Sequence, residues 1–373
     1  MHQHQELDVD VAVIGGGQAG LATSYELGRR GVDHVVLDAA PQTGHSWRTR
    51  WDSLRLFTPA AHSSLPGMPF PGPADHHPSK DEVADYLCRY ARTFDLPIRL
   101  DTPVTSVRSD GGAFAVAAPG LEVTARQVVV ATGPFQTPAT PAMARDLHTD
   151  VLQLHSSEYR RPSQLPNGGT VVVVGGGNSG AQIAAELAST CEVHLATGSD
   201  ARFVPQRLLG RDLFWWLTRT GMLTAAPETR RGRRMQRTEL VIGTDHRELC
   251  RNVTMRPRVI DTVGSTVRFE DRSSVTADAV VWATGFRSSH RFIEVPDALD
   301  GRGLIDQECG VGAVSGLYTV GQPWQRNRAS ALLGFVGQDA ALIAERIAGT
   351  DRSSRSAGSP STRTAPRQAV LAR

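Results

Sequence analysis

A strand–glycine–helix motif that occurs twice constrains the fold of this chain more than any other feature. Residues 11–20 read VAVIGGGQAG and residues 171–180 read VVVVGGGNSG. In each copy, β-branched residues are followed by Gly-x-Gly-x-x-Gly and then by a helix-like stretch, which is the signature of a unit that cradles a nucleotide pyrophosphate. One copy would be a weak signal. Two copies predict an α/β chain with two Rossmann-like domains, which binds two dinucleotides and passes electrons between them.

The first copy has the features of a site for the adenosine half of FAD or NAD. Its first glycine permits the tight turn, its second lets the backbone approach the phosphates, and its third lets helix and strand pack closely. The N–H groups that open the helix then face the pyrophosphate. The next strand, 34–37, ends at Asp38, whose carboxylate can bind ribose hydroxyls and would repel a 2′-phosphate. The residues of this turn are Gly15, Gly17, Gln18, Ala19 and Gly20.

The second copy favours NADP. A helix is expected to about residue 189 and a strand at 192–196, but Ala196 and Thr197 stand where the acid should be. Arg202 and Arg207 follow, and their guanidinium groups suit a 2′-phosphate. A glycine-rich turn without a ligand is the alternative for either copy. The residues of the second turn are Gly175, Gly177, Asn178, Ser179 and Gly180.

Length and composition agree with a two-domain enzyme. The chain has 373 residues, 40% of them hydrophobic, which is enough for about two domains with a sizeable core. No apolar run approaches the roughly 18 residues of a membrane span, and the N-terminus is polar, so no membrane insertion is expected. The cysteines are far apart and form no Cys-x-x-Cys pair, which favours a reduced, cytoplasmic protein without a redox-active disulfide. They are Cys88, Cys191, Cys250 and Cys309.

The net charge of +2 is unevenly distributed along the chain. Residues 351–373 hold five Arg and one Asp, so the rest of the chain is nearly neutral and gives no nucleic-acid signal. This tail is rich in Ser, Arg, Pro and Ala, without hydrophobic periodicity, and we expect it to be disordered.

The order of the segments predicts that one domain is nested in the other. Residues 127–133 read QVVVATG and residues 279–285 read AVVWATG, each predicted as a buried strand that stops at a glycine. These strands flank the second nucleotide unit, and proline-rich turns at 134–141 and 161–169 supply the first crossing. Taken alone, the ATG triplets could be ordinary strand-ending turns. The predicted parts are a discontinuous first domain, 1–160 and 270–350, an inserted second domain, 161–269, and the tail, 351–373.

Four further segments carry a family resemblance together with the glycine motifs and the ATG triplets. They read GHSWRTRWDSLRLFTP from Gly44, HHPSKDEVADYLCRYA from His76, LHSSEYR from Leu154 and GLYTVGQPWQRNRASALLGFVGQDA from Gly316. On these residues the chain resembles the single-component flavin-containing monooxygenases (class B flavoprotein monooxygenases), which include plant YUCCA-type enzymes and bacterial relatives. The resemblance covers nearly all of residues 8–348. It implies a glutathione-reductase-like FAD domain with an inserted NADP domain.

The linker between the domains departs from the family pattern, which is Phe-x-Gly-x-x-x-His-x-x-x-Phe/Tyr. His155 and Tyr159 are present, but Thr149 and Val151 replace the Phe and the Gly. The role of this linker in guiding NADP is therefore in question. Tyr159, where Baeyer–Villiger enzymes of the class usually have Trp, mildly favours heteroatom oxygenation over ring expansion.

The resemblance also implies a reaction, in which the flavin supplies most of the chemistry. NADPH passes a hydride to FAD, and the reduced flavin takes up O2 as a C4a-hydroperoxide. The distal oxygen then goes to a small organic substrate, at an amine nitrogen, a sulfide sulfur or a carbonyl carbon. The implied partners are this substrate and O2, and no metal is implied.

Family position implies roles for residues outside the two turns. Trp47 and Arg48 are expected along the flavin, and Val104, on a strand, is expected to contact the adenine through its backbone. His155 and Ser156 are expected on the nicotinamide side. Without the resemblance, a Trp beside basic residues is more often a rim residue, and a lone His on a loop is usually a solvated or capping residue.

Lys80 is the only lysine beside 39 arginines. Lysine is a compact point charge whose pKa can fall on burial, so Lys80 is a candidate catalytic residue, a charge or proton donor near the flavin. The alternative is chance survival at the start of a helix expected over 81–93.

A basic stretch and an aromatic run each have a structural and a functional interpretation. A dense basic stretch could attract an anionic substrate or a membrane surface, although such stretches are usually solvated helix faces. Its residues are Arg230, Arg231, Arg233, Arg234 and Arg237. The aromatic run Phe214, Trp215 and Trp216 could roof a substrate channel or pack in the core.

Three functional classes follow from these observations. The first is an NADPH-dependent FAD monooxygenase. The second is a flavin-dependent NAD(P)H oxidoreductase that reduces an acceptor without oxygen insertion, which the altered linker favours. The third is a non-catalytic nucleotide sensor, which would keep both glycine motifs only to report redox state.

Overall fold

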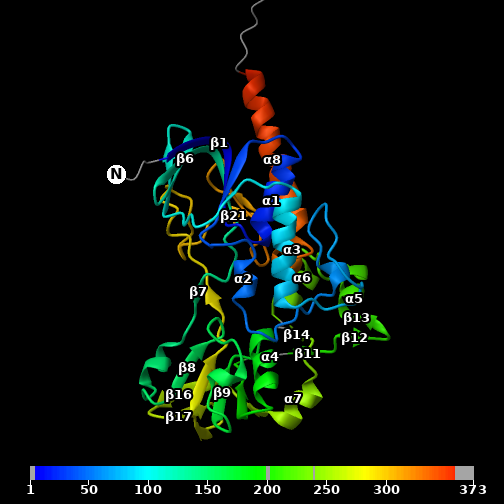
Figure 1. Cartoon of the computed structure of the whole chain (residues 1–373), viewed down its shortest axis with the longest axis vertical. Coiled ribbons are helices and arrows are strands. Elements are labelled where there is room, and N and C mark those ends of the chain that lie inside the picture. The colour runs from blue at the N-terminus through cyan, green and yellow to red at the C-terminus, as the bar shows by residue number, and fades with distance from the viewer. Residues whose placement is uncertain (1–4, 199–201, 238–239, 358–373) are drawn as a thin grey trace, which may run out of the picture.

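The computed structural model describes residues 5–198, 202–237 and 240–357. Two separate parallel sheets, each with its own glycine turn, form the two ends of the elongated molecule in Figure 1. We refer to them as the first and the second domain. Both domains combine a sheet with helices in an α/β arrangement, so the predicted fold class is observed.

The sheet of the first domain has the order β21-β22-β23-β6-β1-β2-β3. Its central strands are parallel, and β2 together with the carboxyl ends of β1 (11–14) and β6 (127–130) is buried, as expected of a parallel sheet covered on both faces. Helices α1, α3 and α8 lie together against it (Figure 1). The strands are β1 (Gln5–Ile14), β2 (His34–Leu37), β3 (Ile98–Arg99), β4 (Ser106–Asp110), β5 (Ala113–Ala118), β6 (Leu121–Val130), β21 (Gln307–Glu308), β22 (Val311–Gly312) and β23 (Leu317–Thr319), and the helices are α1 (Gln18–Gly28), α3 (Lys80–Thr93) and α8 (Val336–Ala357).

The sheet of the second domain has the order β15-β10-β9-β19-β8, with every pair parallel. A three-stranded antiparallel sheet covers one face, where Phe269 and Trp282 share a buried apolar cluster. The strands are β8 (Leu152–His155), β9 (Thr170–Val174), β10 (Glu192–Ala196), β15 (Thr254–Arg256) and β19 (Ala279–Trp282), and the covering strands are β16 (Val259–Val263), β17 (Thr266–Phe269) and β18 (Ser274–Thr276). The helices of this domain are α4 (Asn178–Leu187) and α7 (His246–Asn252).

Two short strands, one from each crossing, join the domains. They are β7 (Thr137–Pro138) and β20 (Phe286–Arg287), and they pair with each other in antiparallel fashion. The expected boundaries therefore need correction. Because β8 and β19 complete the second sheet, the inserted domain extends from β7 to β20, beyond the predicted limits 161–269 on both sides.

An excursion from the second domain, described at residues 202–237 and 240–242, packs back against the first. Phe214 stacks on Phe57 with ring centroids 5.9 Å apart and shares an apolar cluster with Ala329. The excursion consists of β11 (Arg202–Val204), the hairpin β12 (Arg207–Leu208) and β13 (Arg211–Asp212), α5 (Leu213–Arg219), α6 (Arg230–Gln236) and β14 (Leu240–Ile242). The short elements of the rest of the chain are α2 (His45–Arg48), η1 (Ala60–His62), η2 (Ala142–Asp146), η3 (Pro162–Gln164) and η4 (Arg328–Ala331).

Several predicted elements are observed with small shifts. The strands at 34–37 and 192–196 are present, the helix expected to about residue 189 ends at Leu187, and the basic stretch and the aromatic run lie on α6 and α5. The tail expected to be disordered from residue 351 is helical up to Ala357 as part of α8, and its remaining residues lie outside the described part of the chain. Within the described residues, no helix is both long and apolar enough to cross a membrane.

Candidate functional site

The two glycine turns have the same geometry, and each needs its glycines. Gly15 has φ +106° and Gly175 has φ +123°, values that side-chain-bearing residues rarely adopt. A Cβ atom on Gly20 would lie 1.8 Å from the carbonyl oxygen of Gly15, and one on Gly180 would lie 1.9 Å from that of Gly175. In both domains the helix therefore begins in direct contact with the turn, as a pyrophosphate cradle requires.

Each turn also meets the end of the ATG strand of its own domain. A Cβ atom on Gly15 would approach the carbonyl oxygen of Ala131 to 2.7 Å, and one on Gly175 would approach that of Ala283 to 2.2 Å. The two ATG triplets are thus equivalent parts of two Rossmann units, one in each domain.

The helices that follow the turns have no side-chain N-cap. α1 begins after Gly17 and α4 after Gly177, and neither glycine can accept a hydrogen bond through a side chain. By contrast, α3, α5, α6 and α7 are capped by Ser79, Asp212, Thr229 and Asp245. The open N–H groups of α1 and α4 are therefore suited to bind phosphate oxygens.

Asp38 lies where a ribose-binding acid is expected, at the carboxyl end of β2. Its Oδ2 atom would be 2.5 Å from a Cβ atom on Gly16, so the carboxylate faces the glycine turn. Burial raises the pKa of Asp38, while backbone hydrogen bonds from Ala40 and Gly16 oppose this effect. Ribose hydroxyls would give this partly desolvated carboxylate the donors that favour its charged form.

The chain after β23 covers the first turn, and the sequence analysis assigned no residue in it. A Cβ atom on Gly321 would meet the Cβ atom of Ala19 at 2.6 Å, and the Gln18 amide donates to the carbonyl oxygen of Ala331 at 2.8 Å. The Nε2 atom of Gln322 is buried without a hydrogen-bond partner in the described part of the chain. His45 Nδ1, at the start of α2, is in the same state. These polar atoms and the glycine cradle fit a bound dinucleotide such as FAD.

In the second domain, Asn178 has a structural role that the sequence analysis missed. Its side-chain amide donates to the carbonyl oxygen of Leu240 at 3.1 Å and accepts from the N–H of Ile242 at 2.8 Å. The side chain therefore fastens β14 to the start of α4, and only the backbone of Asn178 remains for a phosphate. Ser179 and Gly180 lie in the first turn of the same helix.

The two arginines expected beside a 2′-phosphate differ in their surroundings. Arg207, on the β12–β13 hairpin, donates to the carbonyl oxygen of Gly210 at 3.2 Å and lies 3.7 Å from Asp75 of the first domain. Arg202 opens β11 and is exposed. A third arginine, Arg258, reaches the carbonyl oxygen of Gly198 just after β10. Since the ribose-binding residue of such a unit stands at the end of this strand, Arg258 is the better placed candidate.

His155 and Ser156 lie at the end of β8, beside the junction of the domains. The His155 ring nitrogens bond the Gly285 carbonyl oxygen at 2.9 Å and the Ser157 hydroxyl at 2.8 Å, and burial lowers the pKa of His155. Both ring nitrogens are therefore paired, and the ring ties the linker to the second ATG turn. The expectation that His155 and Ser156 lie on the nicotinamide side stays a prediction. Ser156 is buried, and its N–H donates to Trp282.

Arg50 lies at the same junction and was not singled out from the sequence. Its guanidinium is 5.4 Å from the ring centroid of Phe135 and 5.3 Å from that of Phe286, which follow the two ATG triplets. Burial, followed by repulsion from Arg160, lowers the pKa of Arg50. Two cations close together in a partly buried place favour an anionic ligand at the junction.

Two linker residues, Val151, which departs from the family pattern, and Tyr159, which keeps it, are both held by the second domain. Val151 is buried in the apolar cluster of the second domain, where its side chain adds packing that a glycine could not supply. Tyr159 is fully buried and donates to Glu186 on α4 at 2.8 Å. The linker is therefore anchored to the second domain at both positions.

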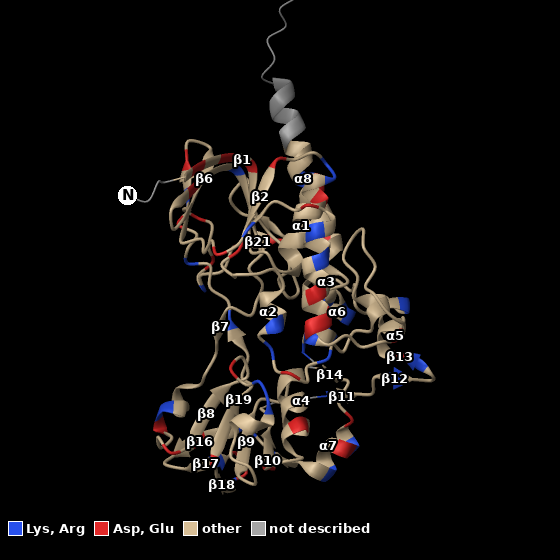
Figure 2. Cartoon of the chain, viewed as in Figure 1, with Lys and Arg blue, Asp and Glu red and all other residues tan. Residues whose placement is uncertain are grey.

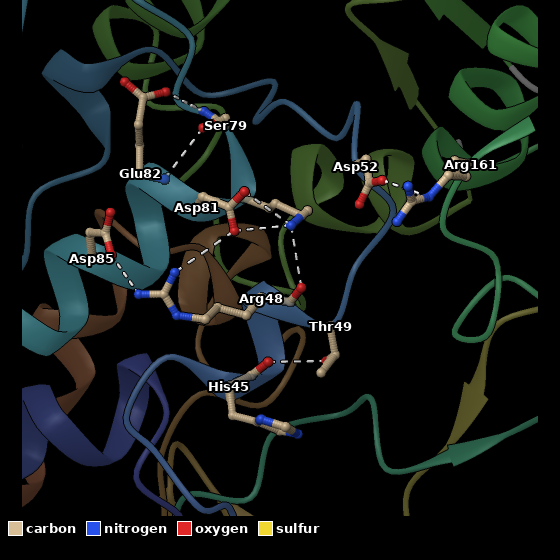
Figure 3. Close-up of polar contacts among 10 residues, drawn as sticks. His45, Arg48, Thr49, Asp52, Ser79, Asp81, Glu82, Asp85 and Arg161 are labelled. Atoms are coloured by element: carbon tan, nitrogen blue, oxygen red, sulfur yellow. Dashed lines mark hydrogen bonds and ion pairs between the residues drawn. The ribbon is translucent and has the colours of Figure 1, made fainter.

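Arg48 and Lys80 bind protein groups rather than an open site. Figure 3 shows the Arg48 side chain directed at Asp81 and Asp85 of α3. Lys80 is buried; its ammonium donates to Asp81 Oδ1 at 2.9 Å and to the Arg48 carbonyl oxygen at 3.3 Å. Both residues join α2 to α3, and these contacts give no support to a catalytic role for Lys80. The helix begins at Lys80 itself, after a Ser79–Glu82 capping box.

Two predicted cofactor residues, Trp47 and Val104, pack against the apolar cores. Trp47, on α2, is partly buried against the main apolar core. Val104 does not lie on a strand, since β4 begins at Ser106, although it packs against the core behind the sheet. In the described part of the chain, no three His, Cys, Asp or Glu side chains are grouped so that they could hold a metal ion.

A cavity of about 460 Å³ lies between the domains. Its walls come from the first-domain loop around Arg55 and Phe57, from His77, and from α4 and α7. None of the predicted cofactor-binding residues lines it, so it is a separate space of the interdomain region.

Comparison with known proteins agrees with this geometry. Residues 12–206 match the family described as pyridine nucleotide-disulphide oxidoreductase. An uncharacterised CzcO-like oxidoreductase of Geobacillus kaustophilus is 42% identical, over 91% of this chain and 98% of its own. Indole-3-pyruvate monooxygenase YUCCA1 of rice is 30% identical, over 83% of this chain and 85% of its own.

A solved structure gives the same result. The flavin-containing monooxygenase of Stenotrophomonas maltophilia superposes with a TM-score of 0.79 at 29% identity, covering 92% of this chain and 99% of the other. The predicted family and the predicted two-domain α/β fold are thereby confirmed. The chain belongs to the pyridine nucleotide-disulphide oxidoreductases, among the single-component flavin monooxygenases, and is an oxidoreductase.

Proposed function

We propose that this protein is an NADPH-dependent FAD monooxygenase that inserts one oxygen atom from O2 into a small organic substrate. FAD binds the first turn, with Asp38 on its ribose, and NADPH binds the second, with Arg258 and Arg202 near its 2′-phosphate. The substrate class is a soft nucleophile or an activated carbonyl: an amine, a sulfide or a ketone.

The observation that carries this proposal is the pair of glycine turns with matching geometry, each at the start of an uncapped helix. The joined crossings β7 and β20 lie between them, so that two dinucleotides can meet at the junction. Family membership and the likeness to a flavin-containing monooxygenase support FAD and NADPH as this pair.

The cysteines indicate whether a protein disulfide could accept electrons from the reduced flavin. All four are free, with Cys88 on α3, Cys250 on α7, and Cys191 and Cys309 outside helices and strands, so the described structure offers no disulfide that a reduced flavin could reduce. This separates the chain from the disulfide reductases that give its family its name. The acceptor must come from solution, and O2 is the acceptor used by the monooxygenases that this chain resembles.

The protein residues bind, orient and shield the cofactors. FAD, once reduced by the nicotinamide, supplies the oxygen-activating chemistry. Arg50 and Arg160 place positive charge at the junction, where it favours developing negative charge. Phe135 and Phe286 hold the Arg50 guanidinium at the junction through contacts with their rings.

Oxygen incorporation from 18O2 tests the proposal directly. The holoenzyme is supplied with NADPH, 18O2 and, in turn, trimethylamine, methyl phenyl sulfide and indole-3-pyruvate. We expect one 18O atom in the product of at least one probe, with NADPH consumed in excess of the H2O2 released. Stoichiometric H2O2 with all three probes would favour the oxidoreductase without oxygen insertion, and no bound flavin would favour a nucleotide sensor.

A further inference from the structure

We propose that the tip of the β12–β13 hairpin, together with α5, docks on the surface of an anionic lipid bilayer. The docking face is defined by Leu208, Leu209, Arg211, Trp215 and Arg219. The hairpin extends to the lateral edge of the molecule, beyond α5 (Figure 1). This surface plays no part in the cofactor sites described above.

The apolar side chains of the docking face are unusually exposed. Leu209 is 83% exposed and Leu208 is 47% exposed, and Trp215 on α5 is also exposed. The Trp216 indole N–H donates to the Leu208 carbonyl oxygen, and Trp215 packs edge-on against Trp216 at 4.7 Å. Two leucines and a tryptophan therefore stand together in solvent, which marks an interaction site rather than scattered surface residues.

The turn that carries Leu209 pays a conformational cost for this side chain. Leu208 pairs with Arg211, so the loop has two residues, Leu209 and Gly210, with φ +50° and +75°. These values are those of a type I′ turn, where Asn or Gly is favoured at the first position. Leucine is strained there and gains no packing within the chain. A residue that costs stability without contacts in the fold points to a binding role.

The segment that carries the apolar tip is rich in arginine. Residues 202–237 contain nine arginines against Asp212 and Glu228, and Asp212 turns inward, 3.4 Å from His77. The Arg211 guanidinium lies 5.5 Å from the Trp215 ring centroid. Three arginines of α6, the helix labelled in Figure 2, and one directly after it line a common hollow of about 280 Å³: Arg230, Arg233, Arg234 and Arg237.

An apolar tip within an arginine-rich surface is complementary to a bilayer with anionic headgroups. Leucine and tryptophan enter the headgroup boundary, while the guanidinium groups bind lipid phosphates. A second copy of the chain fits less well, because a two-fold interface would bring the same arginines face to face. The hairpin lies on the membrane and does not cross it.

Vesicle sedimentation of the holoenzyme tests this proposal. Phosphatidylcholine vesicles with equal parts of phosphatidylglycerol should bind the protein, pure phosphatidylcholine vesicles much less, and about 1 M NaCl should release it because the Debye length falls to about 3 Å. Leu208→Ser with Leu209→Asn should weaken binding at least about tenfold. Arg211→Gln with Arg219→Gln should weaken it about 25-fold.

Matched variants elsewhere provide the controls. Ile260→Thr changes an apolar side chain that is 52% exposed on β16, and Arg89→Gln with Arg92→Gln removes two exposed charges from α3; neither should alter binding. Asparagine suits the turn at 209, so the single variant Leu209→Asn should melt no lower than the parent. The proposal is overturned if the parent ignores anionic vesicles, if the hairpin variants bind equally well, or if Leu209→Asn instead dissociates a dimer in sedimentation velocity.

Discussion

At the scale of single residues, the middle glycine of each turn is needed for ligand binding and not for folding. Gly17 and Gly177 both have φ −75° with extended ψ, which residues with side chains adopt readily, and a Cβ atom on Gly17 would meet nothing within 4 Å. The backbone therefore accommodates alanine at both positions, and the reduced freedom of the unfolded chain stabilises such a variant by about 0.4–1 kcal/mol. A methyl group would nevertheless stand where the phosphates must approach the backbone.

We therefore expect Gly177→Ala to raise the KM for NADPH about tenfold or more without loss of FAD or of thermal stability. Gly17→Ala should weaken FAD retention instead. Gly349→Ala on α8, where a Cβ atom also has open space, is the matched control and should change neither. Steady-state kinetics and flavin content give the answer; an unchanged KM in Gly177→Ala would place the nicotinamide dinucleotide elsewhere.

The roles of several single residues could not be read from the sequence. The rarity of Lys80 indicated function, but its ammonium is bound by Asp81 and by a carbonyl oxygen of α2. His155 is paired through both ring nitrogens. Gln322 and Arg258 lie in no motif that predicts a role, because glutamine and arginine occur throughout such chains. Only packing brings these two residues to the nucleotide units.

At the scale of elements, Lys80 and Arg48 hold α2 against α3. Lys80→Met keeps the aliphatic stem and removes the ammonium, leaving the Arg48 carbonyl without this donor. We expect a loss of about 1–3 kcal/mol in the free energy of unfolding and weaker FAD retention, because α2 carries Trp47 and His45. The pH profile of oxygenation should not change.

Chemical denaturation and coupling measurements distinguish the two roles of Lys80. Lys80→Arg, which keeps a cation, should recover part of the stability. If Lys80→Met instead folds and holds FAD like the parent but releases every electron pair as H2O2, the catalytic hypothesis is correct and the structural one is wrong.

At the scale of the whole molecule, the pair His77–Asp212 connects the two domains. The hydrogen bond with Asp212 raises the pKa of His77 above 6.5, opposed by burial. Burial disfavours the Asp212 carboxylate, but hydrogen bonds from His77, Gln206 and the Phe214 N–H outweigh it and lower the pKa of Asp212. Asp212 therefore stays charged at neutral pH, and the charge of His77 determines the strength of this contact.

The sign of the pH dependence follows. A histidine with a raised folded-state pKa contributes stability fully below about pH 6.5 and loses it as the pH rises through the folded-state value. We expect the difference in melting temperature between the parent and His77→Gln to shrink from about pH 6 to pH 8. His148→Gln, which removes an exposed partner of Asp150, is the control and should show little effect. A difference that grows with pH would contradict this assignment.

The boundaries between the domains also belong to this scale, and the sequence predicted them only in part. The nesting of one unit in the other is correct, but β8 and β19 were assigned to the first domain. Short strands such as β8 and β19 do not encode which sheet they join, since either sheet offers them the same backbone hydrogen bonds. The pairing of β19 with β9 and of β8 with β19 is a tertiary choice.

By itself, the sequence determined the two nucleotide units, their family and the unequal ends of β2 and β10. These are local features: glycine at a left-handed turn, β-branched residues in a buried strand, and Asp38 one position after it. Only the tertiary structure decided which side chains meet across the chain. It assigned Arg207 to Asp75, Asn178 to β14 and Leu209 to solvent, because partners far apart in sequence are chosen by packing, which no local pattern encodes.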